Sequence, residues 1–199
     1  MHTQKELKPV LAYFFLTLAT TGAALAHTGA DSGSHHGAFM GGLLHPLTGT
    51  DHLAAMVAVG IWSAVALRTA WQAPLAFVAL LAVGALAGFA GFQPPGVEPV
   101  IAASIVVLGL LISWRKGLPV GGVVSLVGVF AFFHGVAHGT ELAGGQQLAA
   151  LAGMVVGTAG LHLAGMGLGR WLLAQQHRLH QVVGTVLTLL GTWLLMHAA

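Results

Sequence analysis

Long apolar stretches alternate with short polar ones along the chain, and this pattern predicts helices that cross a membrane. A helix needs about 20 mainly apolar residues to span the hydrocarbon core of a bilayer. Six such stretches can be distinguished: Ala38–Leu67, Pro74–Phe92, Glu98–Trp114, Leu118–Ala143, Gln147–Gly169 and Leu179–His197. We therefore predict an all-α fold, a polytopic membrane bundle of six transmembrane helices that occupies residues 38–199.

The first 26 residues have the pattern of a secretory signal peptide. Lys5 and Lys8 give a positive start, VLAYFFLTLA (residues 10–19) is a short apolar core, and Ala24–Ala26 is a small-residue cleavage site. Cleavage would leave an exported, His-rich leader, residues 27–37, before the bundle. The alternative is an uncleaved first transmembrane helix.

The distribution of charges between the loops predicts the orientation. Every Lys and Arg beyond Lys8 falls after the first, third or fifth stretch: Arg68, Arg115, Lys116, Arg170 and Arg178. The segments on the other side carry only Asp31 and Glu98. Basic residues concentrate in cytoplasmic loops, so we expect a multi-pass protein of the bacterial inner membrane with both mature ends in the periplasm.

The composition agrees with a membrane protein and excludes several other classes. Hydrophobic residues make up 56% of the chain and charged residues 6%, whereas soluble domains carry about 25% charged residues. Cysteine is absent, so disulfides and thiolate metal sites are excluded. The sequence pI of about 9.5 results from very few charges and does not indicate nucleic-acid binding. The 12 histidines are the unusual feature.

The segment HPLTGTDHLAAM (residues 45–56) places ionisable groups inside the first apolar stretch. Pro46 and Gly49 predict a kink or a break there. An aspartate near the middle of a span costs about 2.5–3.5 kcal/mol, so Asp51 should face the bundle interior and pair with another group. His45 and His52 are two turns apart in sequence, which predicts that they share one helical face. For Met56, packing is favoured over ligation through its thioether.

The segment FFHGVAHGTEL (residues 132–142) supplies a second polar stripe, in the fourth stretch. His134, His138 and Glu141 fall on one face of a helix, and Gly135 and Gly139 allow a neighbouring helix to approach. Because the first and fourth helices run antiparallel, we expect the two stripes to meet between the outer surface and the midplane. Imidazoles with carboxylates suit a divalent first-row transition metal, whereas Mg²⁺ and Ca²⁺ prefer oxygen ligands.

Other histidines and acids have weaker assignments. In the leader, His27, His35 and His36, with Asp31, indicate either metal capture or a flexible polar segment. Glu98 could attract cations or simply begin a helix. His162 is isolated, so a structural role or a hydrogen bond to a ligand is favoured over direct ligation. We assign no role to the histidines at 177, 180 and 197.

The two motifs together resemble those of the HupE/UreJ family of small nickel permeases. The family's HPxxGxDHxxAM is matched by His45-Pro46, Gly49, Asp51-His52 and Ala55-Met56, and the pattern continues with Gly60 and Trp62. Its FHGxAHGxE is matched by Phe133-His134-Gly135, Ala137-His138-Gly139 and Glu141. The similarity covers nearly the whole mature chain. It implies uptake of nickel, with cobalt as a second candidate, for enzymes such as hydrogenase or urease, and it suggests that these histidines and acids are the transport residues.

The sequence therefore predicts a secondary permease for a divalent metal ion rather than an enzyme, with no prosthetic group. No GxxxxGK[ST] segment occurs in the chain, so we expect no ATP hydrolysis. The oligomeric state stays open. The alternative is a membrane metalloenzyme or a haem-binding membrane protein that uses the same histidines. Asp51 and Glu141 argue against haem, and the absence of HExxH argues against a zinc protease. A visible absorption spectrum of the purified protein would detect haem.

Overall fold

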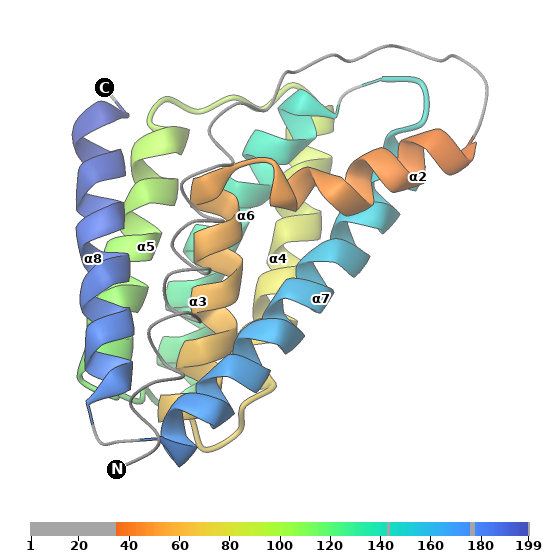
Figure 1. Ribbon diagram of the computed structural model, residues 1–199. Helices are drawn as coiled ribbons and strands as arrows, with labels where there is room; N and C mark the ends of the chain where they lie inside the picture. Colours follow the sequence, from red (N-terminus) through yellow and green to blue (C-terminus); the bar gives the residue numbers. More distant parts are fainter. Residues whose placement is uncertain (1–34, 143, 176–177, 199) are drawn as a thin grey trace.

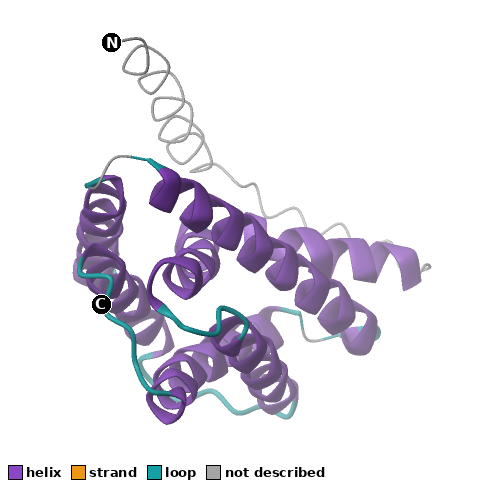
Figure 2. Ribbon diagram, turned by 90° about the horizontal axis from the view of Figure 1, so that it is seen from below, coloured by secondary structure: helices purple, strands orange, loops and turns teal. Residues whose placement is uncertain are grey.

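The computed structural model describes residues 35–142, 144–175 and 178–198, and all regular elements in this part of the chain are helical (Figure 1; Figure 2). They are, in order, α2 (His35–Leu44), the 3-10 helix η1 (His45–Leu47), α3 (Thr50–Ala66), α4 (Gln72–Phe89), α5 (Val97–Ser113), α6 (Val120–Glu141), α7 (Gln147–Ala174) and α8 (Leu179–His197). The all-α prediction is confirmed for these residues. The predicted signal peptide, His27, Asp31 and His177 lie outside them.

We call the end of the bundle that holds the carboxyl terminus of α6 the upper end, as it is drawn in Figure 1. Helices α3, α5 and α7 begin at this end, and α4, α6 and α8 finish there (Figure 1). Successive long helices therefore alternate in direction. Residues late in α6 consequently lie at the same end as residues early in α3, α5 and α7.

The first predicted stretch is broken rather than continuous. Helix α2 ends at Leu44, η1 contains Pro46, and α3 begins after Gly49. The two arms, Gly37–Leu47 and Thr50–Ala66, meet at 78°. Proline has no backbone N–H and its ring collides with the preceding turn, so the α-helical hydrogen bonds cannot continue through residue 46. The predicted kink or break is confirmed, as a sharp break.

Not every helix is long and apolar enough by itself to cross a membrane. Within the described residues, four helices are: α4, α6, α7 and α8. The broken pair would make a fifth span. Helix α5 is apolar but has 17 residues, which rise about 25 Å. The predicted boundaries move by a few residues, most clearly in α7, which continues past Gly169 to Ala174.

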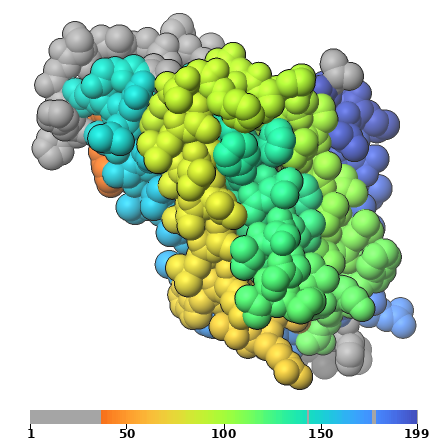
Figure 3. Space-filling model, turned by 180° about the vertical axis from the view of Figure 1, so that it is seen from behind, coloured from red at the N-terminus to blue at the C-terminus, as the bar shows by residue number. Residues whose placement is uncertain are grey.

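Close helix contacts hold the bundle together, and glycines make several of them possible. Helix α4 packs along α6, α5 along α8, and α7 against both α2 and α3. Figure 3 shows α4 and α6 side by side. A Cβ on Gly135 would collide with the backbone of Leu81, and one on Gly139 with that of Ala85. The prediction that these two glycines admit a neighbouring helix is confirmed.

Candidate metal centre

Helix α6 carries a stripe of ionisable side chains close to its upper end. His134, His138 and Glu141 are separated by four and three residues, so successive turns place them above one another. His134 and His138 are buried, whereas the side chain of Glu141 is 51% exposed. The stripe therefore runs from the upper surface into the bundle.

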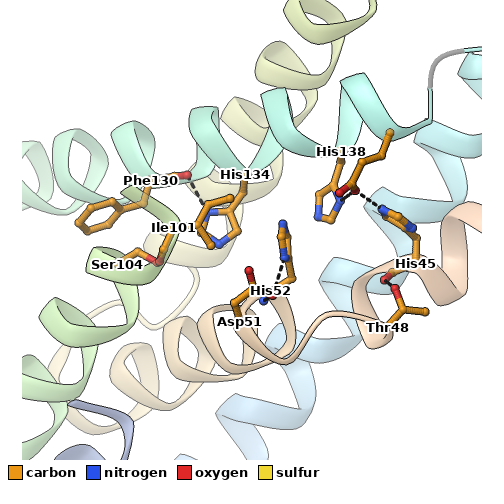
Figure 4. A network of polar contacts seen from close by, with 10 residues as sticks. His45, Thr48, Asp51, His52, Ile101, Ser104, Phe130, His134 and His138 are labelled. Carbon is orange, nitrogen blue, oxygen red and sulfur yellow. Dashed lines mark hydrogen bonds and ion pairs between the residues drawn. The ribbon is translucent and has the colours of Figure 1, made fainter. Parts of the chain in front are cut away.

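The break before α3 brings His45 to the end of this stripe. His45 lies in η1 and His52 in α3, so the prediction that they share one helical face is wrong. The reason is the break at Pro46, which separates the two histidines into different elements. The Nε2–H of His45 donates a hydrogen bond of 2.7 Å to Oε2 of Glu141 (Figure 4). The turn of the chain at Pro46, rather than the periodicity of a single helix, therefore brings His45 to the site.

Asp51 and His52 form a local pair in the first turn of α3. Oδ1 of Asp51 accepts hydrogen bonds from the backbone N–H of His52, at 2.8 Å, and from its Nδ1–H, at 2.9 Å. A Cβ on Gly49 would lie 2.8 Å from Oδ1 of Asp51 and 3.1 Å from Nδ1 of His52, so the glycine leaves room for this pair. The predicted pairing of Asp51 is confirmed.

Four imidazole rings lie in contact between α3, η1 and α6. The ring centroid of His138 is 4.8 Å from that of His45 and 4.3 Å from that of His52. His52 in turn lies 5.2 Å from His134. Figure 4 shows the rings in the order His45, His138, His52 and His134 along the gap between the elements. The two polar segments predicted from the sequence do face each other.

Two of the buried rings each have one nitrogen available for a ligand. The Nδ1–H of His52 donates to Asp51, and that of His134 donates to the carbonyl of Phe130 at 2.8 Å. A neutral imidazole that carries its proton on Nδ1 has a lone pair on Nε2. Among the described residues, Nε2 of His52 and Nε2 of His134 are buried and accept no hydrogen bond. Metal-binding histidines typically show this arrangement, with the other nitrogen bonded to a carboxylate or a carbonyl.

A group of possible ligands also lies at the upper surface. One ligand atom each from His45, His138 and Glu141 can be chosen so that all lie within 4.8 Å of one another. Nδ1 of His138 is 3.6 Å from Oε2 of Glu141. Within the described residues neither ring nitrogen of His138 forms a hydrogen bond, so this ring could turn either nitrogen toward an ion.

Two open clefts reach the cluster from the upper end, and Glu98 lines both. One has a volume of about 210 Å³ and also contains Thr140 and Glu141. The other, of about 270 Å³, also contains Asp51 and His197. Glu98 lies in the first turn of α5, as expected if it begins a helix, and its alternative role of attracting a cation stays a prediction.

The remaining candidates are not among the four rings in contact. Met56 is fully buried in the core, and its sulfur accepts a hydrogen bond of 3.4 Å from Thr158. This contact agrees with a packing role. His162 is buried on α7. His35 and His36 begin α2, while His27 falls outside the described part of the chain.

Phe77 has a ring that contacts two of the histidines, although no sequence pattern points to it. Its centroid lies 5.4 Å from that of His134 and 5.0 Å from that of His162. Phe77 stands in the apolar run APLAFVALLAV, where nothing distinguishes it from a residue that faces lipid. Only the packing of α4 against α6 and α7 reveals its place.

The fold and the site define a class: a helical membrane protein with a histidine and carboxylate cluster between its helices. The chain belongs to the HupE/UreJ family, since the family model described as "HupE / UreJ protein" matches residues 15–194. Protein HupE of Rhizobium leguminosarum bv. viciae is 36% identical over 185 residues, which cover 90% of this chain and 97% of the relative. No solved structure matches the chain. Proteins of this family are membrane transporters of nickel and cobalt rather than enzymes.

Proposed function

We propose that this chain is a secondary permease that takes up Ni²⁺, with Co²⁺ as the second candidate, across the bacterial inner membrane. The main support is that ligand atoms of His45, His138 and Glu141 lie within 4.8 Å of one another. Ligand atoms about 2.1 Å from a first-row metal ion lie at most roughly 4 Å apart. If these side chains shifted by roughly 1 Å or less, all three could therefore bind one ion.

The proposed route leads from the upper surface into the bundle. Glu98 and the leader histidines His27, His35 and His36 gather the ion, and His45, His138 and Glu141 bind it first. The ion then passes to His52 and His134, whose Nε2 atoms are free to ligate. The side chains at the surface are more exposed, 51% at Glu141 and 24% at His45, than those deeper on the route, 2% at His138 and 9% at His52.

Charge compensation comes from the carboxylates, and the driving force from the membrane potential. Asp51 orients His52 through its hydrogen bond, and its negative charge partly balances that of a divalent ion. Glu141 does the same at the surface. A divalent cation that moves inward gains about 4.6 kcal/mol per 100 mV of potential, which is enough to drive accumulation without ATP.

In the membrane, we propose six spans with both mature ends in the periplasm. The α2–η1–α3 segment serves as the first span, and its break lies where the ion binds, as in transporters that use interrupted helices. Helix α5 completes the count, because it packs along the full-length helix α8 and a short span is accommodated by local thinning of the bilayer. We further propose cleavage of the signal peptide after Ala26.

Nickel accumulation in bacteria that lack their own nickel uptake system tests the proposal. We expect Asp51→Asn and His52→Ala each to lower the initial uptake rate at least about tenfold, since a lost ligand or ligand partner costs about 10–100-fold in metal affinity. Met154→Leu, a volume-conserving change at a fully buried position of α7, serves as the control. Rates are normalised to the amount of protein in the membrane. Native uptake in both site variants would refute the proposal.

A further inference from the structure

His162 is a buried polar group for which the proposed route has no use. It lies in the middle of α7 and is 1% exposed. Within the described residues, neither Nδ1 nor Nε2 of its ring has a hydrogen-bond partner. Burying an imidazole without a partner costs free energy, and an apolar side chain of similar size would avoid that cost. Its presence therefore calls for an explanation beyond packing.

Contacts between helices place His162 below the four-ring cluster. Gly60 lies two turns after His52 in α3, and a Cβ on Gly60 would collide with the carbonyl oxygen of His162. Helices α3 and α7 both run downward from the upper end (Figure 1). His162 is therefore about two turns, or roughly 12 Å, deeper than His52.

Polar and aromatic side chains connect the cluster with His162. Met56 follows His52 by one turn, Thr158 precedes His162 by one turn, and the sulfur and hydroxyl oxygen of these two buried residues are 3.4 Å apart. The ring of Phe77 contacts His134 and His162. The residues packed between the cluster and His162 thus include a thioether, a hydroxyl and an aromatic ring.

We propose that His162 is a lower ligand for the transported metal ion, which takes the ion from His52 and His134 on its way across the membrane. This inference rests on the proposed transport function. Among the described residues, no hydrogen bond orients the His162 ring and no carboxylate is bonded to it, in contrast to His52, so this position binds a divalent ion more weakly than the cluster does. Conduction needs such weak sites, because the ion must leave as well as bind.

The first test removes the ligating nitrogens without removing volume. His162→Leu loses no hydrogen bond to any described residue, so its thermal unfolding temperature in detergent should equal or exceed the native value. Its initial uptake rate of Ni²⁺ should fall at least tenfold, while Ni²⁺ binding to the upper cluster of the purified protein stays within twofold of native. Met166→Leu, one turn further along α7 and also buried, should transport normally. Native uptake by a stably folded His162→Leu variant would overturn the proposal.

A second variant gives a direct readout of binding that does not depend on transport. The chain contains no cysteine, so His162→Cys introduces a single thiol into an empty spectral background. If the ion reaches residue 162, Co²⁺ should produce a cobalt–thiolate charge-transfer absorption in His162→Cys and none in Met166→Cys. The absence of this band at Co²⁺ concentrations that saturate the upper cluster would overturn the inference, and this result does not depend on whether the His162→Leu variant folds.

These outcomes separate the inference from the proposed function. If native protein accumulates nickel and Asp51→Asn does not, but His162→Leu does, the permease stands and the lower ligand is wrong. If native protein accumulates no nickel, the proposed function itself fails.

Discussion

The chemistry of each histidine in the cluster depends on which ring nitrogen is already bonded. His52 and His134 use Nδ1 for Asp51 and for the carbonyl of Phe130, so both present Nε2 to the gap between α3 and α6. The motif spacing could predict that these residues are neighbours. It could not predict which nitrogen is free, because the partner of His134 is a backbone atom that any residue type would supply.

At the upper surface, loss of the negative charge of Glu141 should weaken metal binding. Its carboxylate accepts a hydrogen bond from His45 and lies 3.6 Å from Nδ1 of His138. Glu141→Gln keeps the shape of the side chain but removes its negative charge. We expect Ni²⁺ affinity, measured by calorimetry on purified protein, to fall about 10–100-fold.

Thr140→Val is the matched control for Glu141→Gln. Thr140 lines the same cleft, but its hydroxyl donates to the carbonyl of Ala137 in its own helix, so this change should leave Ni²⁺ affinity within about twofold. Equal affinities in native protein, Glu141→Gln and Thr140→Val would exclude Glu141 as a ligand.

At the scale of the helices, the sequence predicts their positions better than their directions. Apolar length located a helix in every predicted stretch, because crossing hydrocarbon requires it. Pro46 marked the break, but not the 78° by which α2 turns away from α3. That angle depends on the packing of α2 against α7, where Gly153 meets the backbone of Phe39, and no local pattern encodes a contact between residues so far apart.

The close approach of α4 and α6 should depend on the missing Cβ of Gly135. In Gly135→Ala, the new methyl group would meet the carbonyl of Leu81, so the helices must separate. We expect a loss of stability of about 1–3 kcal/mol, typical of overpacked cores, and a lower unfolding temperature in detergent. Gly121→Ala, at an open position of the same helix, should be neutral or stabilising by up to about 1 kcal/mol. Equal unfolding temperatures for the two variants would contradict this contact.

Across the whole molecule, the packing of antiparallel and parallel helices brings together histidines that are far apart in the sequence. The two motifs predicted the four-ring cluster because each contains several ionisable groups at helical spacing. His162 looked isolated in sequence, since its neighbours Phe77 and Gly60 belong to α4 and α3 and carry no chemical signal. Its position below the cluster depends on tertiary packing, which the sequence pattern does not display.

The proposed uptake requires the upper end to face the periplasm, and the absence of cysteine makes this testable. Gly145 lies in the exposed upper loop between α6 and α7, with open space at its Cβ position, and Gln175 is exposed after the lower end of α7. A maleimide that cannot cross membranes should label Gly145→Cys in spheroplasts, because their inner membrane is intact and its periplasmic face is open. Gln175→Cys should react only after the membrane is permeabilised, since the basic residues Arg170 and Arg178 favour a cytoplasmic position for that end. The reverse labelling pattern would place Glu141 and His45 on the cytoplasmic side, and the cluster would then bind metal for export rather than uptake.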